Sequence, residues 1–286
     1  MKESHKRLLS QLSKMAEDGK LGIEIRSTRK KYENLPMGIM TMVMAVEDLY
    51  ETKPTEIPNV FSMMDHMCRL MIATYRETYK IDQSIAEAFL QSFVKDYPGV
   101  DESCLVPQLS TLMEAGVNYK DVATSQNRLM VWAQLKNLIL AYNEFLNAFF
   151  GFLIPCLRLT KGKQPDPNVF NQSYSSKIEE MIKLTGGEKG AYWPFCRFAD
   201  SKIRNAIGHG IIWLDANEQK VRFREGKKHR KESEINITDI FAKATFGLYL
   251  GKAYLAAIAS LLVLIDGNEY AKTLLPQQVV RVYYGN

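Results

Sequence analysis

Two long apolar segments, residues 138–157 and 246–265, most constrain what this chain can fold into. A helix that spans a membrane needs about 20 predominantly apolar residues. The first segment is interrupted by Asn143, Glu144 and Asn147, and the second by Lys252. We therefore predict two long helices that are buried on most sides in a protein core, and we expect no membrane partner.

The remaining sequence also favours a mostly α-helical fold. In residues 3–19, Leu8, Leu9, Leu12 and Met15 recur at helical spacing. The same reasoning predicts helices at about 3–19, 36–50, 59–80, 82–96, 102–115, 119–155, 168–184, 188–208 and 238–265. Residues 211–214 and 220–224 are β-like and predict a small hairpin. The composition of the tail, residues 279–284, is compatible with one more strand. We divide the chain into an N-terminal helical region, residues 1–118, and a helical domain, residues 119–286.

Composition and charge narrow the class of protein. Hydrophobic residues make up 46% of the chain and charged residues 24%, which is typical of globular proteins and not of disordered ones. The net charge of +5 permits a polyanionic partner without requiring one. Cys68, Cys104, Cys156 and Cys196 are too far apart for a C-x-x-C metal pair and have apolar neighbours. We expect all four to be reduced core residues of a cytoplasmic protein, since no signal-peptide apolar run follows the basic N-terminus.

Common catalytic motifs are missing from the sequence. The glycines at 186, 187 and 190 lack the spacing of a phosphate-binding loop and follow a predicted helix. The sequence contains no H-E-x-x-H, zinc-finger or G-x-S-x-G pattern. We therefore expect neither a metal site nor a cofactor.

The best candidate site is the cluster of Arg204, Asn205 and His209, at the predicted end of a helix and just before the hairpin. Asn205 and His209 are four residues apart and share a helical face. Arg204 and His209 are five residues apart, so they differ by about 140° around the helix. A structural role is the alternative: Gly210 would adopt the left-handed conformation that ends helices, and His209 would interact with the helix dipole.

The segment Arg204-Asn205-Ala206-Ile207-Gly208-His209-Gly210 resembles the signature of HEPN domains, in which an Arg, a polar residue and a His four to six residues after the Arg lie at a helix end. The resemblance covers about residues 119–270 and implies a helical bundle of the HEPN type. Arg224 and His229 have the same spacing, but they lie in a charged strand-to-loop segment without helical context. Some HEPN proteins carry a tyrosine two residues after the His that a partner nucleotidyltransferase modifies. Ile211 occupies that position here, so we do not expect that regulation.

The resemblance implies metal-independent cleavage of RNA. His209 would exchange a proton with the attacking 2′-OH or the leaving oxygen, Arg204 would bind phosphate, and Asn205 would orient His209 or donate to phosphate. Two such motifs would face each other in a homodimer, in the setting of a toxin or phage-defence system with a neutralising protein partner. The basic residues that follow the motif would bind the RNA backbone; the alternative is that they form a solvated hairpin tip. These residues are Lys220, Arg222, Arg224, Lys227, Lys228, Arg230 and Lys231. The alternative is a non-catalytic HEPN-like module that binds a protein, a nucleotide or a nucleic acid.

Overall fold

The computed structural model describes residues 2–19, 32, 35–51, 60–93, 105–215, 217–225 and 231–285. These residues are mostly helical, as the sequence predicts, with one small antiparallel sheet. The first part of the chain forms α1 (Glu3–Glu17), α2 (Met37–Glu51), α3 (Val60–Ile81), α4 (Gln83–Leu90), the short 3-10 helix η2 (Gln91–Phe93) and α5 (Val106–Val122).

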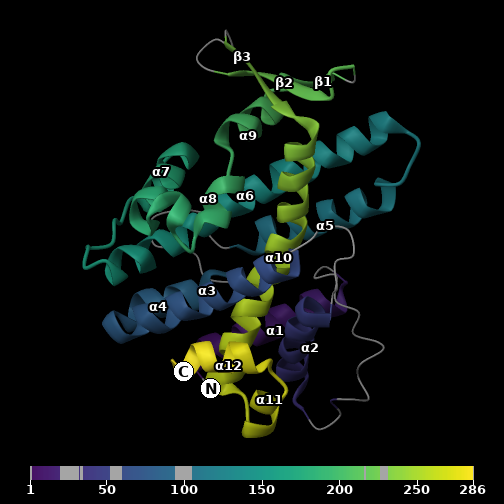
Figure 1. Ribbon diagram of the computed structural model, residues 1–286. Coiled ribbons are helices and arrows are strands. Elements are labelled where there is room, and N and C mark those ends of the chain that lie inside the picture. Colours follow the sequence, from purple (N-terminus) through teal and green to yellow (C-terminus); the bar gives the residue numbers. More distant parts are fainter. Residues whose placement is uncertain are drawn as a thin grey trace.

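The second part of the chain contains the two longest helices and the sheet. Its elements are α6 (Arg128–Thr160), η3 (Val169–Asn171), α7 (Tyr174–Thr185), η4 (Gly187–Lys189), α8 (Trp193–Phe198), α9 (Ser201–Gly208), β1 (Ile212–Asp215), β2 (Lys220–Glu225), β3 (Lys231–Asn236), α10 (Ile237–Asp266), α11 (Glu269–Thr273) and α12 (Gln277–Tyr284). The sheet and α9 lie at one end of the molecule, and α11 and α12 lie at the other (Figure 1).

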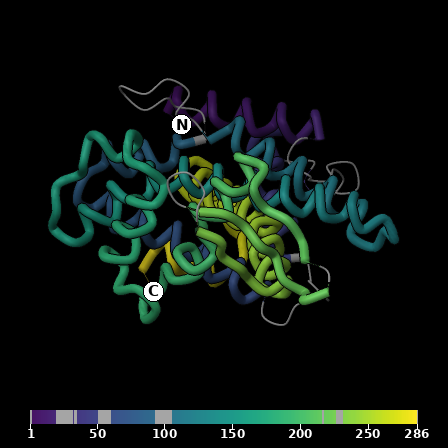
Figure 2. The backbone as a smooth tube through the Cα atoms, turned by 90° about the horizontal axis from the view of Figure 1, so that it is seen from above, coloured from purple at the N-terminus to yellow at the C-terminus, as the bar shows by residue number. Residues whose placement is uncertain are grey.

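Helix α10 is the central element of the core. It runs from the sheet to the opposite end of the molecule, and in the view from above the other helices surround it (Figures 1 and 2). Helices α2, α3, α5 and α6 all pack against it. The contact with α6 is close, because a Cβ atom at Gly247 would overlap the ring of Tyr142.

Both apolar segments form helices, α6 and α10, that are largely buried inside the protein. By length and composition alone each could cross a membrane, and 78% of the most apolar window of each is buried inside the protein. Their polar interruptions make internal contacts. Asn143 is fully buried and hydrogen-bonded, and Lys252 Nζ lies 2.7 Å from Asp48 Oδ2.

One hydrophobic core includes residues from both of the ranges that we distinguished in the sequence. The boundary that we drew at residues 118 and 119 lies inside α5, and α10 packs on α2 and α3. Both ranges therefore contribute to the same core. Cys68, Cys156 and Cys196 are free and buried, as expected, and Cys104 lies outside the described residues.

Several local expectations were wrong. The helix predicted at 119–155 is two helices, because Asn127 caps a new helix by accepting the Met130 N–H. That helix continues through Pro155 to Thr160. The helix predicted at 188–208 is divided into η4, α8 and α9. The tail at 279–284 belongs to helix α12, and β3 was not predicted.

The sheet confirms the predicted hairpin and extends it. Strand β2 lies between β1 and β3 and is antiparallel to both. Ile212, Val221 and Phe223 on one face are buried. The opposite face carries charged residues, which alternate along β2 with the buried ones. It also carries Trp213, which is 37% exposed. The hairpin therefore covers the end of the helical core with one face and presents the other to solvent.

Candidate functional site

Helix α9 presents the Arg204, Asn205 and His209 cluster, and its first residues are firmly anchored. Asp200 is the N-cap and its Oδ1 accepts the Ile203 N–H at 3.0 Å. The second oxygen, Oδ2, lies 3.1 Å from Nζ of Lys243 on α10, whose side chain is 11% exposed. This pair fixes the start of α9 against the central helix.

The end of α9 is a complete Schellman motif, the termination in which a left-handed residue closes the last turn. Gly210 has φ 68°. Its N–H donates to Ile207 O at 3.0 Å, and the Ile211 N–H donates to Ala206 O at 2.9 Å. The glycine termination, which belongs to the structural alternative for this cluster, is therefore present, and His209 occupies the C-cap position just before it.

Arg204 and Asn205 are brought together, and Arg204 has a partner on α6. Arg204 Nε donates to Glu144 Oε1 at 2.7 Å, and Nη1 donates to Asn205 Oδ1 at 2.9 Å. Asn205 and His209 are both exposed, whereas the Arg204 side chain is 35% exposed. The helix keeps its regular turn to Gly208, so Arg204 is directed toward α6 and His209 lies at the helix end.

A buried asparagine next to Glu144 positions α9, and the sequence reasoning missed both residues. Asn143 Oδ1 accepts the Tyr174 hydroxyl and the Asp200 N–H, each at 2.9 Å, while Nδ2 donates to Ile139 O at 2.8 Å. Burial raises the pKa of Tyr174 well above its ordinary value, so its hydroxyl remains a donor. The signal in the sequence was the polar pair Asn143-Glu144 within an apolar segment.

Most described members of the basic cluster after the motif are already in ion pairs. Lys220 Nζ lies 2.5 Å from Glu234 Oε1, and Arg222 Nη2 lies 2.7 Å from Glu218 Oε2. Lys231 Nζ lies 3.1 Å from Glu225 Oε1. Strand β3 supplies Glu234 to Lys220 and Glu232 to Arg222, whose Nη1 lies 3.2 Å from Glu232 Oε1, whereas Glu218 lies in the turn before β2 and Lys231 is itself on β3.

Glu225 and Arg224, at the end of β2, differ in their surroundings. A hydrogen bond from Lys202, together with bonds from Ser233 and Lys231, lowers the pKa of Glu225 to about 2, so this carboxylate is charged at neutral pH. Arg224 is exposed, and its Cζ lies 5.8 Å from the centroid of the Trp213 ring. Lys227, Lys228 and Arg230 lie outside the described residues.

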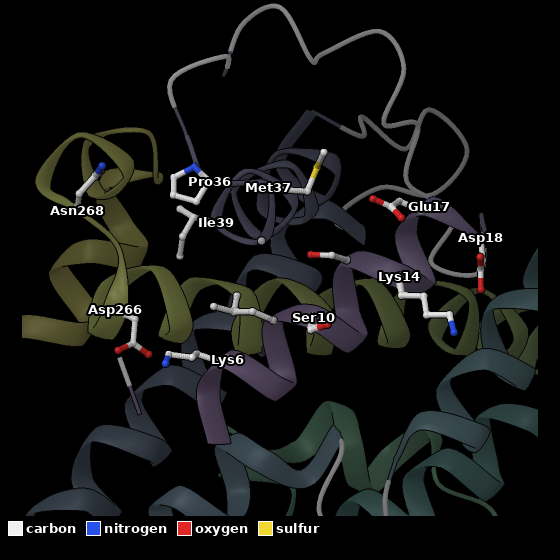
Figure 3. Close-up of a pocket in the computed structure, with 13 residues that line it drawn as sticks. Lys6, Ser10, Lys14, Glu17, Asp18, Pro36, Met37, Ile39, Asp266 and Asn268 are labelled. Carbon is white, nitrogen blue, oxygen red and sulfur yellow. The ribbon is translucent and has the colours of Figure 1, made fainter. Parts of the chain in front are cut away.

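Two grooves lie away from His209. One, of about 520 Å³, runs between α5 and α6 and is lined by Glu114, Asn118 and Glu144 among others. The other, of about 840 Å³, lies between α1, the start of α2 and the turn after α10 (Figure 3). Its lining includes both Lys6 and Asp266. Arg204, Asn205 and His209 line neither groove, although Glu144, the partner of Arg204, lines the first.

Neither a metal-binding group nor a known relative identifies the site. In the part of the chain that the structure describes, no three His, Cys, Asp or Glu side chains are grouped so that they could hold a metal ion. Comparisons of the chain with protein-family models, with curated proteins and with solved structures found no match.

Proposed function

We propose that the protein is a metal-independent endoribonuclease of the HEPN type whose working site is Arg204, Asn205 and His209. The observation that carries the proposal is the exposure of Asn205 and His209 at a rigidly terminated helix end, with the Arg204 guanidinium beside Asn205. A histidine with only a capping role would not need to be exposed. A histidine that exchanges protons with RNA needs that access.

The chemistry divides among three side chains. An RNA 2′-OH attacks the adjacent phosphorus, and His209 takes or returns the proton. The Nη2 group of Arg204 donates to no described residue and is available to a phosphate oxygen, where it would stabilise the charge that develops. Glu144 holds Nε and thereby fixes the plane of the guanidinium.

One Arg-Asn-His set is a small catalytic apparatus, and a second copy would complete it. By resemblance to HEPN proteins, two motifs face each other across one cleft in a homodimer. The exposure of His209 leaves room for such an arrangement. A cytoplasmic toxin or phage-defence role, with a neutralising protein partner, extends the same resemblance.

The second candidate is a non-catalytic helical module that binds a protein, a nucleotide or a nucleic acid. The ion pair between Arg204 and Glu144 favours it, because a guanidinium already held by a carboxylate can serve to join α9 to α6. The Schellman motif likewise gives Gly210 a structural reason to be present. Activity, rather than geometry, distinguishes the two candidates.

The test is cleavage of a mixed RNA panel in excess chelator by the wild type and by His209→Ala and Arg204→Ala variants. Arg197→Ala is a matched control, since Arg197 is exposed on α8, outside α9. We expect the wild type and the control to cut RNA and each site variant to cut at least about 100-fold more slowly. Circular dichroism would verify that all variants are folded.

Cleavage that survives both site substitutions would show that the activity belongs to another site or to a contaminant. Wild-type protein that cuts no RNA in the panel would overturn the nuclease proposal and favour the binding module.

A further inference from the structure

The solvent face of the small sheet carries an exposed tryptophan that the nuclease proposal does not use. Trp213 is opposite Arg222 in the β1–β2 register, and its side chain is on the face away from the buried Val221 and Phe223. It is 37% exposed. Aromatic rings are the surfaces on which unpaired RNA bases stack, because every base offers a flat face.

Arg224 places a cation against this ring. Its Cζ lies 5.8 Å from the Trp213 centroid. Within the described part of the chain Arg224 makes no ion pair, whereas the neighbouring Lys220 and Arg222 are each held by carboxylates. Arg224 is opposite Glu232 in the β2–β3 register, but Glu232 pairs with Arg222 Nη1 at 3.2 Å, so the charge of Arg224 is available to a phosphate.

The ladder of the sheet brings this pair next to the motif. The Arg224 N–H donates to Ile211 O at 3.1 Å, two residues beyond His209. The four residues from His209 to Trp213 span at most about 14 Å even when fully extended. A short strand of RNA at His209 can therefore reach the ring.

We propose that Trp213 and Arg224 form a binding site for one unpaired base of single-stranded RNA and its phosphate. This inference rests on the proposed function, since it places the substrate beside His209. The base stacks on the exposed indole, and the guanidinium of Arg224 contacts the adjacent phosphate oxygens.

The surrounding charges restrict the site to one nucleotide. Glu218, Glu232 and Glu234 lie on or beside the same face and neutralise the other cations of β2. A longer stretch of RNA backbone over the sheet would meet these carboxylates. Arg224 therefore contributes one phosphate contact, which corresponds to a change of about 0.7 in the slope of log K against log salt.

The experiment is a binding titration that does not depend on cleavage. The full chain is titrated into a fluorescein-labelled, mixed-sequence 2′-O-methyl RNA, whose blocked 2′-oxygen cannot attack, and anisotropy is followed at several salt concentrations. We expect Trp213→Ala to weaken binding about tenfold or more. Trp213→Phe should retain most of the affinity, and Arg224→Ala should reduce the salt slope by about 0.7.

The matched control is Trp132→Ala. Trp132 also has a cation above its ring, Lys136 Nζ at 5.6 Å. It lines a groove with Leu214, whose side chain is on the other face of β1. This variant should bind RNA like the wild type.

The outcomes separate this inference from the nuclease proposal. Binding that depends on Trp213, in a protein that cuts no RNA, supports the base site and overturns the nuclease. Cleavage by the wild type, with RNA binding that Trp213→Ala leaves unchanged, overturns the base site alone. Failure of the wild type to bind the modified RNA overturns the base site, and the cleavage assay then decides the nuclease separately.

Discussion

Arg204 and Glu144 form an ion pair between α9 and α6 that is partly exposed to solvent. Their side chains are 35% and 37% exposed, and exposed pairs typically contribute less than about 1 kcal/mol. We expect Arg204→Ala and Glu144→Ala each to lower the free energy of unfolding, measured in urea, by less than that amount. A much larger loss would make Arg204 a structural residue and support the binding-module alternative.

Lys177 on α7 makes the stability of the protein dependent on pH. Its side chain is almost fully buried, and Nζ donates to the Asn147 backbone oxygen and to Oδ1, each at 3.1 Å. Burial lowers its pKa from 10.5 to about 8. The unfolded chain therefore holds this proton more tightly than the folded protein, and the resulting cost, about 3 kcal/mol, is fully present below pH 8.

We expect the free energy of unfolding of the wild type, relative to Lys177→Met, to rise as the pH increases from about 8 to about 10.5. The variant removes the titrating group, so the difference between the two proteins isolates its effect from that of other groups. Urea unfolding of both proteins at several pH values would measure it. A difference that stays constant over this range would mean that Lys177 has an ordinary pKa.

The end of α9 contains two glycines, Gly208 and Gly210, that can be compared directly. An alanine Cβ at either Gly208 or Gly210 would meet no atom within 4 Å, but only Gly210 has positive φ, at 68°. We expect Gly210→Ala to lower the melting temperature, because an L-residue in the left-handed region costs about 1–2 kcal/mol. Gly208→Ala should raise it, since alanine favours a helix over glycine by about 1 kcal/mol. Equal effects at both positions would contradict the Schellman termination.

The elements that could be predicted from the sequence are those with strong local signals. The periodic helices α1 and α3, the β1–β2 hairpin and the glycine at the end of α9 all have such signals. The errors arose where capping, or packing against residues distant in the sequence, determines the secondary structure. Asn127 starts a new helix inside a continuous apolar pattern. Helix α12 is helical although its valines and tyrosines favour a strand. It packs against α3, where Arg76 donates to the Val282 carbonyl at 2.6 Å.

The candidate site was predictable only in part, for the same reason. Arg204, Asn205 and His209 are close in sequence, so their spacing on one helix end can be read directly. The partner of Arg204 is Glu144, which is 60 residues away. The pairing of Lys220 and Arg222 with carboxylates depends on the register of β3, which the sequence did not reveal. Contacts of this kind require the tertiary fold.

Helix α10 connects the two ends of the molecule. It begins directly after β3 at the motif end and ends at Asp266 beside α1. If two motifs complete one site, the protein should have in solution twice its chain mass of 32.7 kDa. Light scattering during size-exclusion chromatography measures this mass. A single-chain mass at concentrations where RNA is cut would rule out a composite site.

The role of the 2′-OH can be tested by cleavage of an RNA in which one nucleotide, at a mapped cleavage position, carries 2′-deoxyribose. The proposed mechanism requires the 2′-OH at that position as the nucleophile, with His209 exchanging its proton. It predicts that the substituted strand stays intact there while neighbouring sites are cut, and that His209→Ala cuts neither strand. Cutting at the deoxy position at the normal rate would rule out the 2′-OH as the nucleophile.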